Sequence, residues 1–393
     1  MSDKITFVLP SRNNLEFLQL AYKSLRNLKT IHQVLVLDDA SVDGTLDWLN
    51  SLNDPDLTVY SNPGPNRVGI VGMFDKGIEL ATTDIIFAFH ADMIASPNLD
   101  TNILKYLKRG TVVSATRVEP PLHPSGPEKI TLSLGNDAVD FDFENTITVL
   151  KQLEDTNIDK TTEGIFAPWC MYKEDFFAVG GHDELFAPQS KEDSDLFNRF
   201  HLIGYKFIQS WDALVYHFTS RGSRFNKHSG GDVGINSREW IKTTTNNGRN
   251  FIRKWGHFVN HDEYMKPLVP HKYDIAFVAK NCRIEHLQFL EIFCSDIYTD
   301  LDSIIVNDYI KAEQPNTKFN LKERIHDIGE TPKNDIIITI DCKNWNDSMQ
   351  ESILNISDIL TVNEIEVGTY EFDSIQIEVK SVNFYENNLI KSV

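Results

Sequence analysis

The sequence predicts an α/β protein with two domains: a larger one on a mostly parallel sheet, then a smaller C-terminal α/β domain. From residue 5 to residue 92, short β-branched segments alternate with amphipathic helical segments. This alternation is typical of a parallel sheet with helices on both faces. A second alternation begins beyond about Pro270. We therefore expect an N-terminal domain at 1–228, a connecting helical segment at 229–269 and a small α/β domain at 270–393.

The N-terminal elements follow in a regular order. Strands are expected at 5–11 and 32–41, which are short β-branched runs. Between them Leu15, Leu18 and Leu25 recur at helical spacing, so a helix is expected there. The next predicted elements are a helix at 44–52, a strand at 57–62, a helix at 69–81 and a strand at 84–92. A segment rich in Pro, Gly and Asp then indicates an insertion over one face. The remaining predicted elements of the domain are a helix at 146–157, a helix within the segment 192–207 that ends at Gly204, and a strand at 212–218.

The C-terminal domain is expected to alternate in the same way. The predicted elements are a strand at 273–280, a helix at 283–297, strands at 302–308 and 334–342, a helix at 347–360 and terminal strands within 369–386. No phosphate-binding glycine motif or cluster of titratable residues stands out there. Asp341 and Cys342, at a strand end, are expected to be structural.

Composition narrows the class of function. The chain has 393 residues and a formal charge of −19, which argues against a general polyanion-binding surface but leaves room for a divalent cation. The four cysteines form no CxxC pair, so neither a zinc site nor a disulfide framework is indicated. We expect no membrane span and no secretory signal, and therefore a cytoplasmic protein.

Two carboxylates end the second predicted strand. In VLDDASVDGT, Asp38 and Asp39 follow a buried run, where charge needs a partner. Capping by Ser41 or Asp43 explains part of the pattern but not the doublet. The segment NPGPNRVGI (62–70) alone would be only a Gly/Pro turn.

In combination, these segments resemble family 2 glycosyltransferases with the GT-A fold. DDASVDGT resembles the family pattern DDxSxDxT, and LPSRNN and NPGPNRVGI resemble two further family segments. The resemblance spans about residues 5–224. It implies that Asp39 binds the uracil or ribose side of a sugar nucleotide and that Asp38 supports it. It also places other residues near the donor: Pro10, Ser11, Arg12, Asn66, Arg67 and Gly69.

The segment FHADM takes the place of the family's Asp-x-Asp metal motif. By this resemblance Asp92 binds Mg²⁺ or Mn²⁺ on the diphosphate, and Ala91 lies beside the donor. His90 stands where the first aspartate usually does. It is expected to bond the ribose, to join a softer ion such as Mn²⁺, or simply to finish the strand.

A second group of motifs resembles the acceptor side of the same family. Trp169, Asp183 and Glu184 are implied to contact the donor sugar or the acceptor, although Asp183 also fits a turn cap. Glu192 and Asp193 match a Glu-Asp pair at the start of a helix. The resemblance makes Asp193 the general base; the alternative is an N-terminal cap.

A histidine and a basic loop follow the last strand. His217 matches a second protein ligand for the metal. Arg221 and Arg224, with Lys227 and His228, are expected to close over the diphosphate; the alternative is a solvated loop.

These residues imply an inverting, metal-dependent glycosyltransferase that uses a nucleotide-sugar donor, with UDP as the expected nucleotide. The acceptor class stays open among saccharide, protein, lipid and modified nucleic acid. The C-terminal domain is expected to recognise the acceptor or to mediate self-association as a homo-oligomer. Three alternatives stay open. A nucleotidyltransferase is disfavoured because LPSRNNLE has one arginine and no glycine. The others are a non-catalytic nucleotide- or sugar-binding module and a structural protein that has kept the fold.

Overall fold

A computed structural model describes residues 4–372 and 375–390, and the chain divides into two compact units. The described part of the N-terminal unit comprises residues 4–244 and 261–267, and that of the C-terminal unit comprises 245–260 with 268–372 and 375–390. Helix α8 (Arg238–Trp255) begins in the first unit and ends in the second. Each unit has its own sheet and core, so each is described separately.

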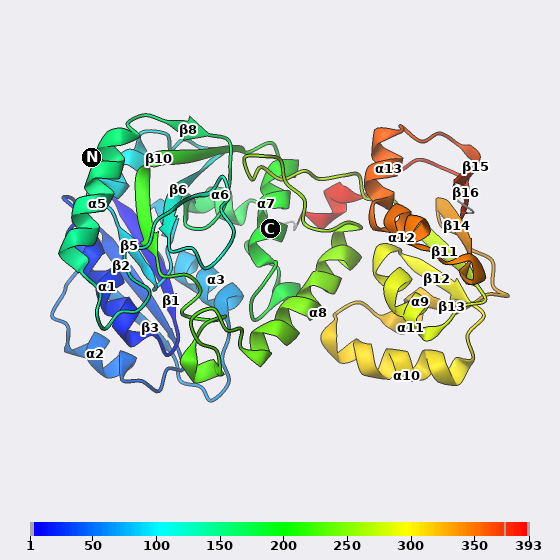
Figure 1. Ribbon diagram of the computed structural model, residues 1–393, viewed down its shortest axis with the longest axis horizontal. Helices are drawn as coiled ribbons and strands as arrows, with labels where there is room; N and C mark the ends of the chain where they lie inside the picture. Colours follow the sequence, from blue (N-terminus) through cyan, green and yellow to red (C-terminus); the bar gives the residue numbers. More distant parts are fainter. Residues whose placement is uncertain (1–3, 373–374, 391–393) are drawn as a thin grey trace. The chain divides into compact units, whose positions relative to one another are not determined.

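The N-terminal unit is built on one mixed sheet (Figure 1). Its main strand order is β3-β2-β1-β4-β9-β6-β10-β5, with β7 beside β6 and β8 beside β10. Strands β3, β2, β1 and β4 run parallel, as do β6 and β10. The carboxyl ends of β1, β2 and β4 therefore share one edge, where open α/β sheets bind ligands. The strands are β1 (Ile5–Ser11), β2 (Gln33–Asp39), β3 (Leu57–Asn62), β4 (Ile85–Ala88), β5 (Met93–Ala95), β6 (Thr111–Glu119), β7 (Lys129–Thr131), β8 (Thr161–Thr162), β9 (Trp169–Tyr172) and β10 (Lys206–His217).

Amphipathic helices cover this sheet. Helix α1 buries Leu18, Ala21 and Leu25, which share one face at helical spacing. Strand β2 is buried along its whole length, as expected of a parallel strand covered on both faces. The predicted α/β class is thus confirmed. The helices are α1 (Leu15–Arg26), α2 (Thr45–Ser51), α3 (Ile70–Leu80), α4 (Leu99–Leu104), α5 (Phe143–Thr156), α6 (Lys173–Phe177) and α7 (Glu192–Leu202), with 3-10 turns η1 (Glu184–Phe186) and η2 (Lys227–Ser229).

The C-terminal unit has a six-stranded sheet in the order β13-β12-β11-β14-β16-β15. The first four strands are parallel, and β16 and β15 add antiparallel pairs at one edge. The strands are β11 (Ile275–Lys280), β12 (Asp296–Thr299), β13 (Ile325–Asp327), β14 (Ile336–Asp341), β15 (Gly368–Phe372) and β16 (Ile375–Val379). The helices are α9 (Ile284–Leu290), α10 (Ser303–Glu313), α11 (Leu321–Arg324), α12 (Asp347–Leu354) and α13 (Ile356–Val362), with 3-10 turns η3 (Glu291–Phe293), η4 (Gln314–Asn316), η5 (Cys342–Asn344) and η6 (Glu386–Leu389).

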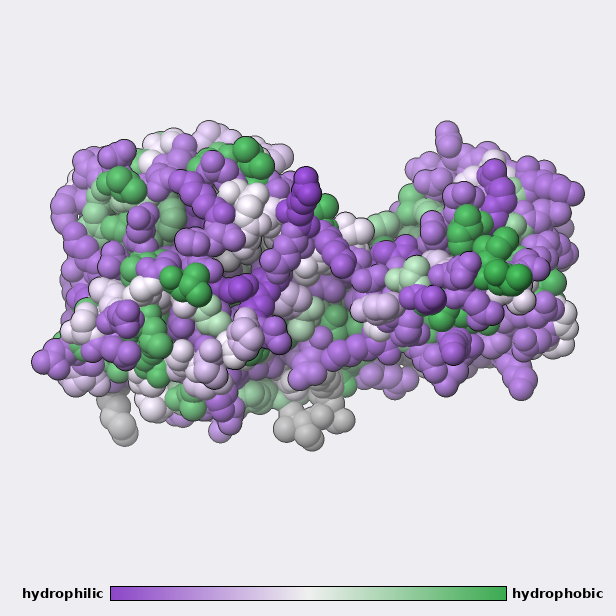
Figure 2. Space-filling view, turned by 90° about the horizontal axis from the view of Figure 1, so that it is seen from below, coloured by the Kyte–Doolittle hydropathy of each residue, from purple (hydrophilic) through white to green (hydrophobic). Residues whose placement is uncertain are grey.

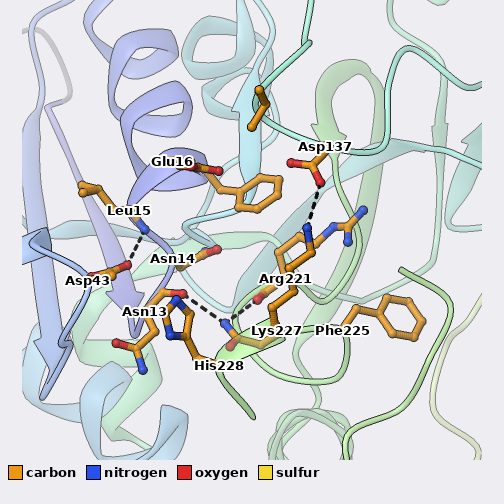
Figure 3. A pocket seen from close by; sticks show the side chains of 13 residues that line it. Asn13, Asn14, Leu15, Glu16, Asp43, Asp137, Arg221, Phe225, Lys227 and His228 are labelled. Carbon is orange, nitrogen blue, oxygen red and sulfur yellow. Dashed lines mark hydrogen bonds and ion pairs between the residues drawn. The ribbon is translucent and has the colours of Figure 1, made fainter. Parts of the chain in front are cut away.

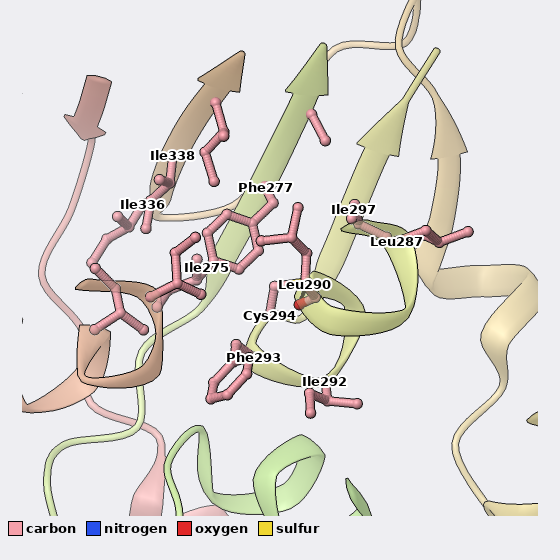
Figure 4. Packing of buried hydrophobic residues seen from close by; sticks show 14 of the residues in the cluster. Ile275, Phe277, Leu287, Leu290, Ile292, Phe293, Cys294, Ile297, Ile336 and Ile338 are labelled. Carbon is pink, nitrogen blue, oxygen red and sulfur yellow. Dashed lines mark hydrogen bonds between the residues drawn. The ribbon is translucent and has the colours of Figure 1, made fainter. Parts of the chain in front are cut away.

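Aliphatic side chains fill the core of this unit. Figure 4 shows Phe277 of β11 between Ile336 and Ile338 of β14 on one side and Leu290 of α9 on the other. Phe277, Leu290, Ile336 and Ile338 have no exposed surface. The unit therefore has a core of its own.

The strand predicted at 302–308 is wrong, because these residues begin helix α10. Asp302 caps the helix by accepting a hydrogen bond from the Ile304 backbone N at 2.8 Å. Ile304 is 70% exposed, so the β-branched run that suggested a buried strand lies partly at the surface. The strand of this region is instead β12, at the end of the segment predicted as a helix.

The surface is largely polar, in keeping with the charge of −19. The face shown in Figure 2 is mostly hydrophilic, with hydrophobic areas scattered over it. Within the described residues, no helix combines the length and apolarity that a membrane crossing requires.

Candidate donor and metal site

Buried polar atoms without partners lie at the carboxyl ends of β1 and β2. Ser11 is aligned with Asp38 across the two parallel strands. Within the described part of the chain, Ser11 Oγ, Arg12 Nε and Asp38 Oδ1 are buried and have no hydrogen-bond partner. Burial raises the pKa of Asp38. Unpaired buried polar atoms are costly, so this spot has the character of a binding site for a polar ligand. Pro10, beside it, is partly exposed.

Asp39 organises the loop that follows β3. Its carboxylate accepts hydrogen bonds from Asn62 Nδ2 at 2.7 Å and from the backbone N of Val68 and of Gly69, both at 2.8 Å. Gly69 has φ +92° and packs so closely on Pro188 that a Cβ would lie 2.4 Å from it. Asp39 is thus engaged in shaping the loop, whereas Asp38 keeps an unused oxygen.

The remaining predicted residues of that loop lie further out. Asn66 is exposed, and its carbonyl oxygen accepts a hydrogen bond from Asn62 Nδ2 at 2.8 Å. Arg67 forms an ion pair with Glu239 of α8 at 2.6 Å. A contact between either residue and a donor stays a prediction.

His90 and Asp92, which follow β4, converge with His217, the last residue of β10. Each offers one ligand atom, and these atoms lie within 4.8 Å of one another. His217 Nε2 lies 3.5 Å from Asp92 Oδ1, while Asp92 Oδ2 accepts a hydrogen bond from the Arg221 backbone N at 2.7 Å. Asp92 and His217 are 4% and 6% exposed. Ala91, between the first two residues, is buried.

Glu119 completes this cluster, and the sequence analysis did not identify it. Its Oε1 lies 2.6 Å from His217 Nδ1. Arg117 lies 3.3 Å from one carboxylate oxygen and Lys129 lies 3.1 Å from the other. A carboxylate on the far nitrogen of a histidine is the arrangement that orients imidazole ligands in metal sites. The only signal in the sequence was an acidic residue ending a strand before Pro-Pro.

The charges of the cluster are strongly coupled. Burial alone would lower the pKa of His217, but the carboxylates of Asp92 and Glu119 raise it to about 9. Burial alone would raise the pKa of Asp92, but His217 and His90 lower it to about 2. Burial lowers the pKa of His90, which favours its neutral form.

The donor set fits a divalent cation. Two imidazole nitrogens and one carboxylate oxygen suit Mn²⁺ or a similar borderline ion better than Mg²⁺, which prefers oxygen ligands. Asp92 Oδ1 and His217 Nε2 face each other at 3.5 Å. A cation between them would take the place of the Nε2 proton of His217 and would be bound by both side chains. The residues present therefore fit the metal that the sequence motif predicts.

The acidic start of α7 belongs to the same region. Glu192 is 8% exposed, and burial together with the negative charge of Asp193 raises its pKa to about 8. Asp193 is half-buried, and its charge acts on His90. Of the two, Asp193 is the carboxylate that reaches the surface. The residue before them, Lys191, has φ +74°, so a strained turn delivers this pair.

The predicted acceptor-side residues occupy different environments. Trp169 is 1% exposed and stacks on Phe176 at 6.0 Å between ring centroids, a packing role. Asp183 accepts a hydrogen bond from the Leu185 backbone N at 2.9 Å, as the turn-cap alternative predicts. Glu184 is exposed. Position alone therefore gives Trp169 no support as a substrate contact.

The two arginines of the loop after β10 hold that loop in place. The guanidinium of Arg221 donates to the Asn136 carbonyl and lies over the Phe17 ring, 5.6 Å from its centroid. The guanidinium of Arg224 lies 4.5 Å from the centroid of the Trp240 ring. Within the described ranges neither guanidinium forms a hydrogen bond or ion pair with Asp92, although the charge of Asp92 acts on Arg221.

A cavity of about 370 Å³ adjoins this loop. Figure 3 shows Asn13 and Glu16 at the start of α1 facing Arg221 and Lys227 across it. Lys227 Nζ lies 3.4 Å from Asp137 Oδ2. The remaining residues that line the cavity are Asn14, Leu15, Phe17, Asp43, Val139, Phe225, Asn226 and His228. The loop thus lines the cavity and also bonds Asp92 through its backbone.

A family model and a curated protein match parts of this chain. Residues 6–171 match the model of the family described as glycosyl transferase family 2. A curated relative, the undecaprenyl-phosphate mannosyltransferase of Micrococcus luteus, is 27% identical over 120 residues, which are 30% of this chain and 49% of that protein. The match thus spans about half the length of this relative.

Two solved structures are also similar. One is a mannosyltransferase from Pyrobaculum calidifontis in complex with GDP-Man and Mn²⁺, with 19% identity, a TM-score of 0.39 and coverage of 55% of this chain and 56% of that one. The other is S. aureus TarS in complex with UDP-GlcNAc, with 14% identity, a TM-score of 0.38 and coverage of 55% and 61%. The family match covers both the Asp38–Asp39 segment and the His90–Asp92 segment. Residues 6–171 of this chain are thus similar to glycosyl transferase family 2.

Proposed function

We propose that the N-terminal unit is an inverting, metal-dependent glycosyltransferase that moves a sugar from a nucleotide-sugar donor to an acceptor hydroxyl. The convergence of His90, Asp92 and His217 within 4.8 Å carries this proposal, with Glu119 fixing the far side of His217. The cluster lies at the carboxyl ends of the strands of a family 2 domain. That edge is where a nucleotide diphosphate is expected in an open α/β sheet.

Two residues would hold the metal and a third would join them. Asp92 and His217 are the proposed ligands, and His90 is the added nitrogen that favours Mn²⁺. When bound, the cation would neutralise the charge that develops on the departing nucleoside diphosphate. Glu119 keeps the His217 ring oriented and accepts its Nδ1 proton, which leaves Nε2 for the site.

Asp193 is the proposed general base. An inverting transfer is a single displacement, so one carboxylate must accept the proton of the attacking hydroxyl. Glu192 is a poor candidate for this proton at neutral pH, since its pKa of about 8 keeps it protonated. It instead leaves Asp193 as the single negative charge of the pair. The half-buried position of Asp193 gives an acceptor access to it.

The nucleotide is proposed to lie over the ends of β1 and β2. Ser11, Arg12 and Asp38 present the unpaired buried atoms there. A carboxylate oxygen and a hydroxyl match the imide and ribose groups of a uridine, so UDP remains the first choice. The relative from Micrococcus luteus is named an undecaprenyl-phosphate mannosyltransferase, which adds a mannosyl donor and a polyprenyl phosphate to the candidates. The C-terminal unit is proposed to recognise the acceptor or to mediate self-association.

A donor panel tests this function. Full-length protein is incubated with the common UDP-, GDP- and TDP-sugars in Mn²⁺, Mg²⁺ or EDTA, and nucleoside diphosphate release is measured. We expect Mn²⁺-dependent release from one donor. Asp193→Asn should retain donor binding by calorimetry but lose transfer to an acceptor, whereas Asp155→Asn, on the exposed face of α5, should behave as wild type.

The outcomes separate the alternatives. Donor binding without turnover, unchanged by Asp193→Asn, would favour a non-catalytic nucleotide-binding module. No binding of any nucleotide, with or without metal, would favour a structural role for the fold.

A further inference from the structure

A second group of metal-ligand side chains lies in the C-terminal unit, at the carboxyl edge of its parallel strands. Cys282 follows β11, Cys342 follows the neighbouring strand β14, and His286 stands in the first turn of α9. One ligand atom from each of the three lies within 4.8 Å of the others. None of these residues belongs to the glycosyltransferase domain.

The three side chains are shielded from solvent to different degrees. His286 is 4% exposed and Cys342 is 5% exposed, while Cys282 is partly buried. The ring of His286 packs against Trp345, with centroids 4.8 Å apart. The site is therefore mostly enclosed, with access on the side of Cys282.

Two carboxylates hold the loops that carry the cysteines. Asp300, after β12, accepts hydrogen bonds from the backbone N of Asn281 at 2.6 Å and of Cys282 at 2.9 Å. Asp341 Oδ1 accepts from Asn281 Nδ2 at 2.8 Å and from the Lys343 backbone N at 3.1 Å. The ends of three adjacent strands are thereby tied together around the two thiols. Such support restricts the ligands before any metal binds.

The thiols also interact with each other. The hydrogen bond with Cys342 lowers the pKa of the Cys282 thiol, and the same bond raises that of Cys342. A thiolate is the form of cysteine that binds metal.

The geometry points to a binding site for a thiophilic divalent cation of the Zn²⁺ class, held by Cys282, His286 and Cys342. Two thiolates and a neutral imidazole balance the two positive charges, so the loaded site carries no net charge into its enclosed surroundings. The two thiol protons leave to solvent on binding. Three protein ligands leave a fourth tetrahedral position for water.

Metal loading requires one local change at His286. Its Nδ1 accepts a hydrogen bond from the Arg283 backbone N at 3.2 Å, and its Nε2 lies 3.4 Å from Arg283 Nη2. A metal bond would replace one of these two contacts. Burial lowers the pKa of His286, and the neutral imidazole is the form that binds metal.

Cobalt spectroscopy tests the proposal on the full-length, reduced protein. Co²⁺ bound by two thiolates in a tetrahedral site gives a sulfur-to-metal charge-transfer absorption and intense visible bands, whereas a site of nitrogen and oxygen ligands gives no thiolate absorption. We expect one equivalent of Co²⁺ with these bands, displaced by Zn²⁺. Cys282→Ser and Cys342→Ser should each abolish the charge-transfer band or reduce its intensity to that of a single thiolate ligand. His286→Ala should weaken Co²⁺ affinity at least tenfold.

Matched variants keep the result specific. Cys294→Ala removes a buried thiol of the same unit, and His326→Ala removes a partly exposed imidazole paired with Asp296. Both should leave the thiolate charge-transfer band unchanged, as should Asp92→Ala in the other unit. Absence of the thiolate band in folded wild type, or its persistence in the Cys282→Ser and Cys342→Ser double variant, would overturn the proposal. So would a Cys282–Cys342 disulfide in freshly purified protein that, once reduced, takes up no Co²⁺.

Discussion

Glu119→Gln isolates the contribution of a residue that contacts the proposed metal only through His217. The glutamine keeps the shape of the side chain but replaces a buried carboxylate that lies 2.6 Å from His217 Nδ1 by a neutral amide. Loss of such an outer-shell partner usually lowers metal affinity ~10–100-fold, about 1.4–2.7 kcal/mol. We therefore expect Mn²⁺ affinity to fall within this range and the Mn²⁺ requirement for donor turnover to rise in parallel.

Stability has to be separated from this effect. Glu119 also pairs with Arg117 and Lys129, and Lys129 is only 4% exposed in its side chain. Removing one partner of a buried pair costs ~3–5 kcal/mol when nothing replaces it. Here Glu128 remains, 3.2 Å from Arg117 and 3.7 Å from Lys129, so the loss of stability should be smaller.

Glu128→Gln is the matched control, because it removes a carboxylate from the same two cations without touching His217. Calorimetric Mn²⁺ titration of both variants, each first shown to be folded, decides the matter. Glu119→Gln should lose Mn²⁺ affinity and Glu128→Gln should not. Wild-type Mn²⁺ affinity in folded Glu119→Gln would refute the role assigned to this carboxylate.

Three further perturbations follow from the contacts described. Asp39→Ala removes the acceptor of three hydrogen bonds that shape residues 62–69 and should cost about 3 kcal/mol of unfolding free energy and the nucleotide binding measured by calorimetry; a variant with wild-type stability would contradict this. Glu291→Gln removes a buried carboxylate that the Arg253 guanidinium contacts through Nε and Nη2, and because Glu313 still pairs with Arg253 it should cost less than the ~3–5 kcal/mol of an unreplaced partner in urea unfolding; wild-type stability would contradict this. The pKa of Glu192 is raised from 4.5 to about 8, so between these pH values the folded state holds one more proton than the unfolded state, and stability falls as pH rises. Glu192→Gln should therefore gain stability relative to wild type between pH 4.5 and pH 8 in urea unfolding. A parallel pH dependence of the two proteins would contradict this.

Much of the fold follows from local pattern. The alternation of buried strands and amphipathic helices through residues 5–92 predicted both the class and the order of the first elements, because parallel strands buried on both faces leave a strong apolar signal. The pattern failed at 302–308, where Ser303 to Val306 have strand propensity but Asp302 caps a helix. A capping hydrogen bond and partial exposure decided against the β-branched residues.

The candidate site was predictable where a motif is contiguous and not where it is assembled by tertiary structure. Asp92 and His217 lie far apart in the sequence, and the family resemblance was needed to bring them together. Glu119 carries no local signature and becomes significant only through its distance to His217. The same reason hid the pair Cys282 and Cys342. The cysteines form no CxxC pair in the sequence, but Cys282 and Cys342 follow the adjacent strands β11 and β14, which bring them together.

The most direct test of the central claim is the binding of nucleoside diphosphate to wild type and to Asp92→Asn, by calorimetry in Mn²⁺ and in EDTA. Asparagine preserves the size of the side chain and an oxygen for the Arg221 backbone N, but not the charge that a cation requires. We predict that UDP or GDP binds wild type in Mn²⁺, that EDTA weakens this binding, and that Asp92→Asn loses the Mn²⁺-dependent part. Nucleotide binding that is equally strong in EDTA and in Asp92→Asn would contradict the assignment of this cluster as the metal centre of a glycosyltransferase.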